Sequence, residues 1–300
     1  MTATKESHAL RAYALLAAVM LFWAGNAIVG RAVRDDIPPF TLALVRWAGA
    51  LLILIPFVYP LLREDVPALL RHWKQTLMLG LLGVAGFNGF LYLGLHQTTA
   101  TNGILIQAGI PPLILILNFL LFRERARWMQ AFGLTLSTIG VIVVVVHADL
   151  DALIHMQFGR GDVLILCAVV VWSLYASLLR LRPPVHPLSF LAATFVVGAL
   201  AMLPLAIGEW EEGLRIVWRP MTFAAFAYVA TLPSLVAYHF FNQAVAMIGA
   251  GRAGQMINLM PLFGALLAAF VLGEPLHAFH FAGMALILVG IVLASVARPT

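Results

Sequence analysis

Charged residues are scarce in this chain of 300 residues. Lys, Arg, Asp and Glu together make up 10% of the sequence, whereas 62% of the residues are hydrophobic. Soluble domains carry about 25% charged residues, so this composition excludes a water-soluble globule. The chain has more apolar surface than one soluble core could bury, and we expect an all-helical, polytopic membrane protein.

Cysteine and intramembrane acids are also lacking. The single cysteine, Cys167, lies in an apolar run, so no disulfide can form within one chain and redox chemistry is not expected. No Asp or Glu lies near the middle of an apolar segment, and no nucleophile, acid pair or metal-ligating set lies at one depth. We predict no enzymatic activity, no catalytic residue, no metal and no cofactor. Nucleic-acid binding is not expected either, because the basic residues behind the net charge of +5 are dispersed in short loops.

Apolar segments long enough to cross a membrane fill most of the chain, since a spanning helix needs about 20 residues. The predicted spans are 11–33, 40–62, 75–96, 102–122, 128–147, 161–181, 187–208, 221–246, 253–273 and 278–297. We therefore predict ten transmembrane helices.

The second half of the sequence repeats the first. Pro111, Glu124, Gly133 and Gly140 recur 150 residues later as Pro261, Glu274, Gly283 and Gly290, and Trp23 recurs as Trp172. We predict two five-helix repeats, residues 1–150 and 151–300, which form one unit. Because five is odd, the repeats must have inverted topology. With both termini in the cytoplasm, twelve Lys and Arg residues lie inside and five outside, as the positive-inside rule requires.

Inverted-repeat transporters bind substrate near the midplane between the halves, so polar residues, aromatics and prolines at that depth are the candidate cavity residues. They are Trp23, Asn26, Asn88, Tyr92, Gln107, Pro111, Trp172, Tyr175, Ser234, Tyr238, Asn242, Asn258 and Pro261. Ser234, Tyr238 and Asn242 recur every four residues and form one helical stripe. Prolines remove a backbone donor, so Pro261 is expected to free the carbonyl of Ile257. The alternatives are kinks that only shape packing and ordinary interhelical hydrogen bonds.

A second group of residues has a gating or structural interpretation. Arg46 is the one charged residue well inside a predicted span, where it either snorkels to the outer end, gates the path or binds a substrate carboxylate. The glycines Gly83, Gly86 and Gly89 are expected to admit a neighbouring backbone or to leave a thin wall. Glu124 and Glu274 are expected to cap turns and to bond the backbone beside them.

The duplicated pattern resembles the drug/metabolite transporter superfamily. The residues that carry the resemblance are Pro111, Glu124, Gly133, Gly140 and their copies, and Phe22–Asn26 together with Pro38 and Arg46 resembles the EamA-type branch. The resemblance covers nearly the whole chain. It implies a central cavity surrounded by the first four helices of each half, with the fifth and tenth helices outside. The acid-free, aromatic-rich interior is similar to that of bacterial aromatic amino-acid exporters.

These observations lead to the expectation of a secondary transporter in the bacterial inner membrane. It would export small metabolites, with neutral or aromatic amino acids as the expected substrates, by alternating access, and would function as a monomer. The alternatives are export of other metabolites or drug-like cations, and a passive channel or lipid-handling protein. The expected partners are a small-molecule substrate and the lipid bilayer.

Overall fold

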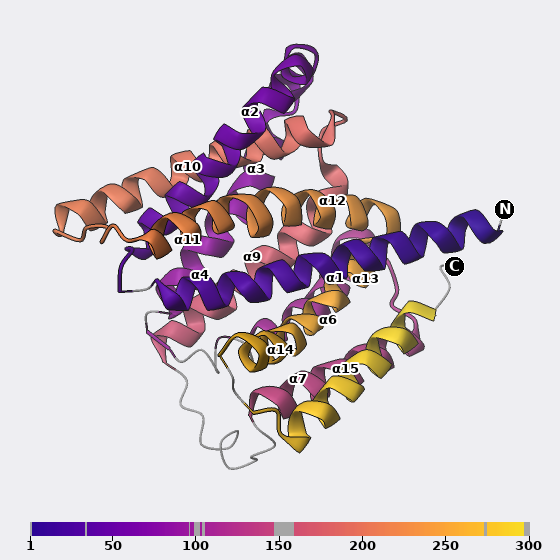
Figure 1. Cartoon of the computed structure of the whole chain (residues 1–300). Helices are drawn as coiled ribbons and strands as arrows, with labels where there is room; N and C mark the ends of the chain where they lie inside the picture. Colours follow the sequence, from indigo (N-terminus) through magenta and orange to yellow (C-terminus); the bar gives the residue numbers. More distant parts are fainter. Residues whose placement is uncertain are drawn as a thin grey trace.

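The structure, a computed structural model, describes residues 2–33, 35–95, 97–98, 103, 106–146, 159–272 and 275–296, and within these ranges all regular secondary structure is helical (Figure 1). The helices of the first half are α1 (Thr2–Ala32), α2 (Pro39–Arg71), α3 (Trp73–Gly80), η1 (Leu81–Gly86), α4 (Phe87–Leu95), α6 (Ile110–Phe122) and α7 (Trp128–Val145). Those of the second half are α9 (Arg160–Leu178), η2 (Leu179–Leu181), α10 (Pro187–Glu211), α11 (Pro220–Ala230), η3 (Thr231–Val236), α12 (Ala237–Ile248), α13 (Ala250–Gln255), η4 (Met256–Leu259), α14 (Met260–Leu272) and α15 (Ala278–Val296).

Seven helices in the described part of the chain are long and apolar enough to cross a membrane, and two shorter apolar helices accompany them. The shorter ones are Ile110–Phe122 and Ala278–Ala294. The chain is therefore a polytopic helical membrane protein. Its exterior suits lipid, because large apolar side chains such as Phe57 and Phe270 are exposed on it.

The predicted spans 102–122 and 253–273 are not continuous α-helices. A turn at Ala108–Gly109 precedes α6, and the 3₁₀ turn η4 separates α13 from α14. Pro111 and Pro261 each follow the break and lie in the first turn of the next helix, where a missing N–H costs little. The expectation that Pro261 frees the carbonyl of Ile257 is wrong, because the backbone N–H of Met260 donates to it across the 3₁₀ turn.

Helix α2 continues nine residues past the predicted end at residue 62, to Arg71. Its end projects beyond the neighbouring helices at one side of the bundle (Figure 1). The added residues include Arg63, Glu64 and Asp65, which made this stretch too polar for the predicted span, and Pro67, which lies inside the helix without ending it. The end of the apolar run at residue 62 therefore does not mark the end of the helix.

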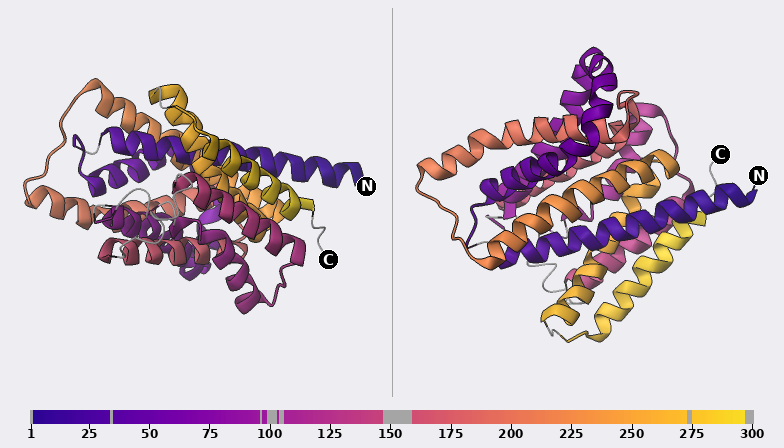
Figure 2. Two further views of the ribbon diagram at one scale, coloured as in Figure 1. Left: turned by 90° about the horizontal axis from the view of Figure 1, so that it is seen from below. Right: turned by 45° about the horizontal axis from the view of Figure 1, so that its top comes forward.

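The helices pair across the two halves of the sequence. The most extensive packing joins α7 to α15, α2 to α10, α4 to α9 and α1 to α12. Helices α7 and α15 lie side by side at one edge of the bundle, away from α2 and α10 (Figures 1 and 2). This agrees with the expectation that these two helices lie outside the others.

Glycines let the backbones of α7 and α15 touch. A Cβ atom added to Gly140 would lie 2.7 Å from the carbonyl oxygen of Gly283, and one added to Gly133 would overlap the carbonyl oxygen of Gly290. Real Cβ atoms do not approach backbone so closely, so only glycine fits at these crossings. The repeated glycine pair of each half therefore has its partner in the other half.

Replacing Gly290 by alanine is expected to lower the stability of the protein. The new methyl group would lie 2.6 Å from the backbone nitrogen of Ser137, so α15 must shift away from α7. Overpacking of this kind costs about 1–3 kcal/mol. The measurement is the Tm of purified protein in detergent. Gly264→Ala is the matched control, because nothing lies within 4 Å of an added Cβ there. A Tm that falls no further for Gly290→Ala than for this control would contradict the packing argument.

Candidate functional site

Aromatic rings from α1, α2, α9 and α12 pack together at the centre of the bundle. The ring centroid of Trp23 lies 5.2 Å from that of Trp172 and 6.0 Å from that of Tyr238. Trp47 contacts the ring of Tyr238 edge to face at 5.2 Å. The side chains of Trp172 and Tyr238 are each 2% exposed. We call Trp23, Trp47, Trp172, Tyr175 and Tyr238 the aromatic cluster; its rings contact one another, and all except the half-buried Trp23 are buried.

Two π-helical turns, η1 and η3, lie 150 residues apart in the sequence and have the same hydrogen-bond shift. In η1 the backbone N–H of Phe87 donates to Leu82, so it bypasses Gly83, its usual α-helical acceptor. In η3 the N–H of Ala237 donates to Leu232 and Ser234 and bypasses Pro233. Each turn thereby frees one carbonyl from its ordinary helical donor, at Gly83 and at Pro233.

Side chains from the opposite half of the sequence bind both of these carbonyls. The hydroxyl of Tyr238 donates to the carbonyl oxygen of Gly83 at 2.7 Å. The indole N–H of Trp23 and the Nη2 of Arg46 donate to the carbonyl oxygen of Pro233 at 3.0 and 3.1 Å. A buried carbonyl without a partner is costly, so these bonds hold the halves together at the two turns.

Arg46 lies at the junction of α2, α4 and η3. Its Nε donates to the Ser234 hydroxyl at 2.5 Å, and its Nη1 donates to the Asn88 amide oxygen at 3.3 Å and to the Tyr92 hydroxyl at 3.5 Å. The guanidinium also stacks over the Trp47 ring, 4.5 Å from its centroid. Arg46 is only 4% exposed, so it turns inward and does not snorkel to a helix end.

All the acceptors of Arg46 are neutral. Among the described residues, no carboxylate lies within ion-pair distance of its guanidinium. Buried cations are ordinarily paired with acids, because desolvating an uncompensated charge costs several kcal/mol. The site therefore holds one net positive charge.

The local sequence explains why Ser234 can accept from Arg46. Pro233 has no N–H, so it cannot donate to the carbonyl of Val229 one turn earlier. The Ser234 hydroxyl donates to that carbonyl instead, at 2.6 Å, and its lone pairs remain for Arg46. Asn88 is held in the same way, because its amide nitrogen donates to the carbonyl of Val84 at 2.8 Å and its oxygen faces the guanidinium.

A second polar pair lies beside the cluster. The Tyr175 hydroxyl donates to the amide oxygen of Asn242 at 2.8 Å, and both side chains are buried. The amide nitrogen of Asn242 has no hydrogen-bond partner among the described residues. The Tyr175 ring packs directly on Gly83. At Gly83 the predicted glycine strip therefore admits a side chain, and not the neighbouring backbone that was one of the two expectations.

Other predicted cavity residues lie elsewhere or make only local contacts. Gln107 donates to the carbonyl of Gly103 in its own segment, and Asn258 donates to the Ser137 hydroxyl on α7. Asn26 is half-buried on α1, one turn beyond Trp23. An added Cβ on Gly89 would meet only the end of Met202, and one on Gly86 would meet Val171 and the carbonyl of Leu81.

The side chain of Glu124 was expected to bond the backbone of its own turn, but it does not. Its carboxylate binds the guanidinium of Arg180 through two bonds of 2.8 and 3.0 Å, and Arg180 stacks on the Phe122 ring. Arg123 makes the turn possible by adopting a left-handed conformation with φ of 60°. The sequence copy of this glutamate, Glu274, lies outside the described residues.

Glu209 is a structural residue that sequence reasoning missed. Its carboxylate accepts the backbone N–H groups of Phe40 and Thr41 at 2.7 and 2.8 Å and the Thr41 hydroxyl at 2.9 Å. It thereby caps the first turn of α2 from the end of α10. From the sequence, an acid at the end of an apolar segment is expected to be a solvated loop residue. Only its burial in the structure indicates that Glu209 caps α2.

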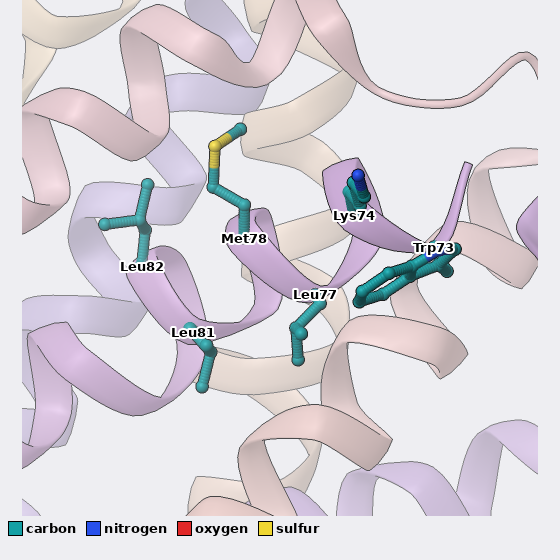
Figure 3. A pocket seen from close by; sticks show the side chains of 6 residues that line it. All are labelled: Trp73, Lys74, Leu77, Met78, Leu81 and Leu82. Carbon is teal, nitrogen blue, oxygen red and sulfur yellow. The ribbon is translucent and has the colours of Figure 1, made fainter.

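A shallow groove with a volume of about 370 Å³ lies on the outer surface of α3 and η1 (Figure 3). It is lined by Trp73, Lys74, Leu77, Met78, Leu81 and Leu82. Its lining comes only from α3 and η1 and includes none of the cluster residues, so we treat it as lipid-facing surface and not as part of the site.

Comparison with known proteins finds relatives that align with nearly the whole chain. The chain is 27% identical over 292 residues to the uncharacterized transporter YetK of Bacillus subtilis, covering 96% of this chain and 87% of that protein. It is also 27% identical to an uncharacterized transporter of Archaeoglobus fulgidus, over 95% of this chain and 97% of the relative. A solved crystal structure has the same fold, with a TM-score of 0.78 and 19% identity over 94% of this chain and 96% of that one.

The family model agrees with these relatives and matches twice along the sequence. The EamA-like transporter family model covers residues 10–146 and again residues 159–296. The two matches span most of the chain, and they fall on either side of residues 147–158. The chain belongs to the EamA-like transporter family.

Proposed function

We propose that the protein exports small metabolites, namely amino acids with neutral or aromatic side chains, across the bacterial inner membrane by alternating access. The observation that carries this proposal is Arg46, a buried cation whose acceptors are all neutral. A substrate carboxylate would supply the missing negative charge through charge-assisted hydrogen bonds. The aromatic cluster beside Arg46 offers an apolar surface for the substrate side chain.

The charge of the site decides among substrate classes. A drug-like cation would meet Arg46 with like charge, and no described carboxylate near the cluster would offset that repulsion. A large polyanion such as a nucleotide sugar would need several cations, whereas the described centre has one. A single carboxylate with an apolar side chain fits both conditions.

The proposed architecture is ten transmembrane helices in two inverted five-helix repeats, residues 1–150 and 151–300, with both termini in the cytoplasm. This architecture is supported by contacts between the halves that stay the same when each residue is replaced by its copy in the other repeat. The pair Gly133–Gly290 becomes the pair Gly283–Gly140 when 150 is added to the first number and subtracted from the second. The π turns η1 and η3 correspond in the same way.

Two ion pairs suggest how such a transporter opens. Glu124 binds Arg180 at 2.8 Å on the proposed cytoplasmic side, and Asp36 binds Arg219 at 3.2 Å on the proposed outer side. Each pair joins one half of the sequence to the other. With both formed and the centre packed, the conformation is that of an occluded carrier, not of an open channel. Breaking one pair at a time would open one side only. Both ion pairs and the central site belong to one chain, so a monomer would suffice for transport.

Transport of radiolabelled phenylalanine into proteoliposomes tests the proposal. We expect saturable counterflow that 3-phenylpropanoate, which has only the carboxylate, inhibits more strongly than phenethylamine, which has only the ammonium. The reason is that Arg46 binds the carboxylate. No flux above protein-free liposomes for a panel of amino acids would disprove amino-acid transport. Stronger inhibition by phenethylamine would disprove the role of the cation, and flux that does not saturate would favour a channel.

A further inference from the structure

We propose that the carbonyl oxygen of Gly83 is the binding site for the substrate ammonium group, and that the Tyr238 hydroxyl occupies this place until substrate binds. The inference rests on the proposed function, because it concerns the second charged group of an amino acid whose carboxylate is bound by Arg46. It assigns a role to the π turn η1 that the carboxylate site alone does not require.

The first reason is that Gly83 O is available to a ligand. The π turn removes its ordinary donor, the N–H of Phe87, which binds Leu82 instead. Its donor is the Tyr238 hydroxyl at 2.7 Å, a side chain from the other half of the sequence. A ligand can therefore displace the side-chain hydroxyl from this oxygen without breaking a helical backbone bond.

The second reason is the contrast with Pro233 O, the corresponding carbonyl in η3. That oxygen is bound by the Trp23 indole at 3.0 Å and by the Arg46 guanidinium at 3.1 Å. An ammonium placed there would face the positive charge of Arg46. The two related turns have thus diverged: the carbonyl of Pro233 helps to fix the cation, and that of Gly83 is held only by a neutral group.

The third reason is the surroundings of the hydroxyl. The Tyr238 ring contacts the rings of Trp172 at 5.8 Å and Trp23 at 6.0 Å. Aromatic faces attract cations, most strongly where water is excluded. The carbonyl and the rings would therefore stabilise an ammonium without the help of an acid. This matters because no described acid lies within ion-pair distance of Arg46. Arg46 reaches the same turn through Asn88, whose amide nitrogen donates to the carbonyl of Val84, the neighbour of Gly83.

The substitution Tyr238→Phe tests the inference, because it removes the hydroxyl and keeps the ring. Equilibrium binding of phenylalanine and of 3-phenylpropanoate is measured with the purified full-length protein. We expect phenylalanine to bind about three- to tenfold more tightly to the variant, since its ammonium no longer competes with one hydrogen bond. Binding of 3-phenylpropanoate, which has no ammonium, is expected to change less than twofold.

Tyr228→Phe is the matched control, because the Tyr228 hydroxyl also donates to a backbone carbonyl, that of Phe22 at 3.0 Å, outside the π turns. We expect it to leave the ratio of the two affinities unchanged. The inference is overturned if Tyr238→Phe leaves phenylalanine binding unchanged, or if it alters both ligands equally. If neither ligand binds the unmodified protein, the proposed carboxylate site itself fails, which is a different result.

Discussion

Replacing Arg46 by lysine is expected to lower kcat/KM for phenylalanine at least tenfold while the protein stays folded. Lysine keeps the charge but not the planar group that reaches Ser234, Asn88 and the carbonyl of Pro233 at once. A lysine ammonium can satisfy only part of this set, and hydrogen bonds to charged groups contribute about 1.5–3 kcal/mol each. Loss of one such bond to the bound carboxylate corresponds to a decrease of about tenfold or more. Initial rates of counterflow in proteoliposomes measure the effect.

The same substitution at Arg63 is the control for Arg46→Lys. Arg63 lies on α2 as well, but it is at the polar end of the helix and donates to the Tyr59 hydroxyl at 3.0 Å on the exposed surface. We expect Arg63→Lys to transport at the unmodified rate. Equal Tm values for the unmodified protein and the Arg46→Lys variant would show that lost transport is not lost folding. Full transport by Arg46→Lys would remove the basis of the proposed carboxylate site.

The residues around Arg46 show what the sequence could predict. Helical spacing put Ser234, Tyr238 and Asn242 on one face, and the structure places all three in the buried interior. Asn88 and Tyr92, four residues apart, both meet the guanidinium. Spacing cannot tell which helix faces which, so the partners of Arg46 could not be assigned from the sequence. They come from positions 42 to 188 residues away.

Backbone irregularity was the harder part to predict. A proline signals an interrupted helix, and breaks do precede Pro111 and Pro261. The π turn η1 contains no proline, so nothing in its sequence marks the carbonyl of Gly83 as free. Asn258 was predicted to line the site because it lies at the same depth as the proline kinks, yet it bonds Ser137 on the peripheral helix α7. Depth in the membrane alone does not decide which way a side chain points.

Replacing Gly83 by alanine is expected to destabilise the protein and to impair transport. The added methyl group would lie 2.5 Å from Cε2 of Tyr175. That ring is 1% exposed, contacts Trp172 at 5.2 Å and is tied to Asn242 through its hydroxyl, so it has no room to yield. Overpacking a closed core costs about 1–3 kcal/mol, which outweighs the gain of up to about 1 kcal/mol from the better helix propensity of alanine.

Gly89→Ala separates this steric effect from helix propensity. Gly89 lies in α4, which continues the helix of η1, and an added Cβ would meet only the flexible end of Met202, at an ordinary contact distance of 3.7 Å. We expect the Tm of Gly89→Ala to equal or exceed that of the unmodified protein, and its phenylalanine counterflow to be unchanged. Gly83→Ala should lower both. If both variants behaved alike, the role of Gly83 would be only to loosen the helix. If only Gly83→Ala lowers the Tm and the counterflow, the glycine is required because the Tyr175 ring packs on it while its hydroxyl bonds Asn242.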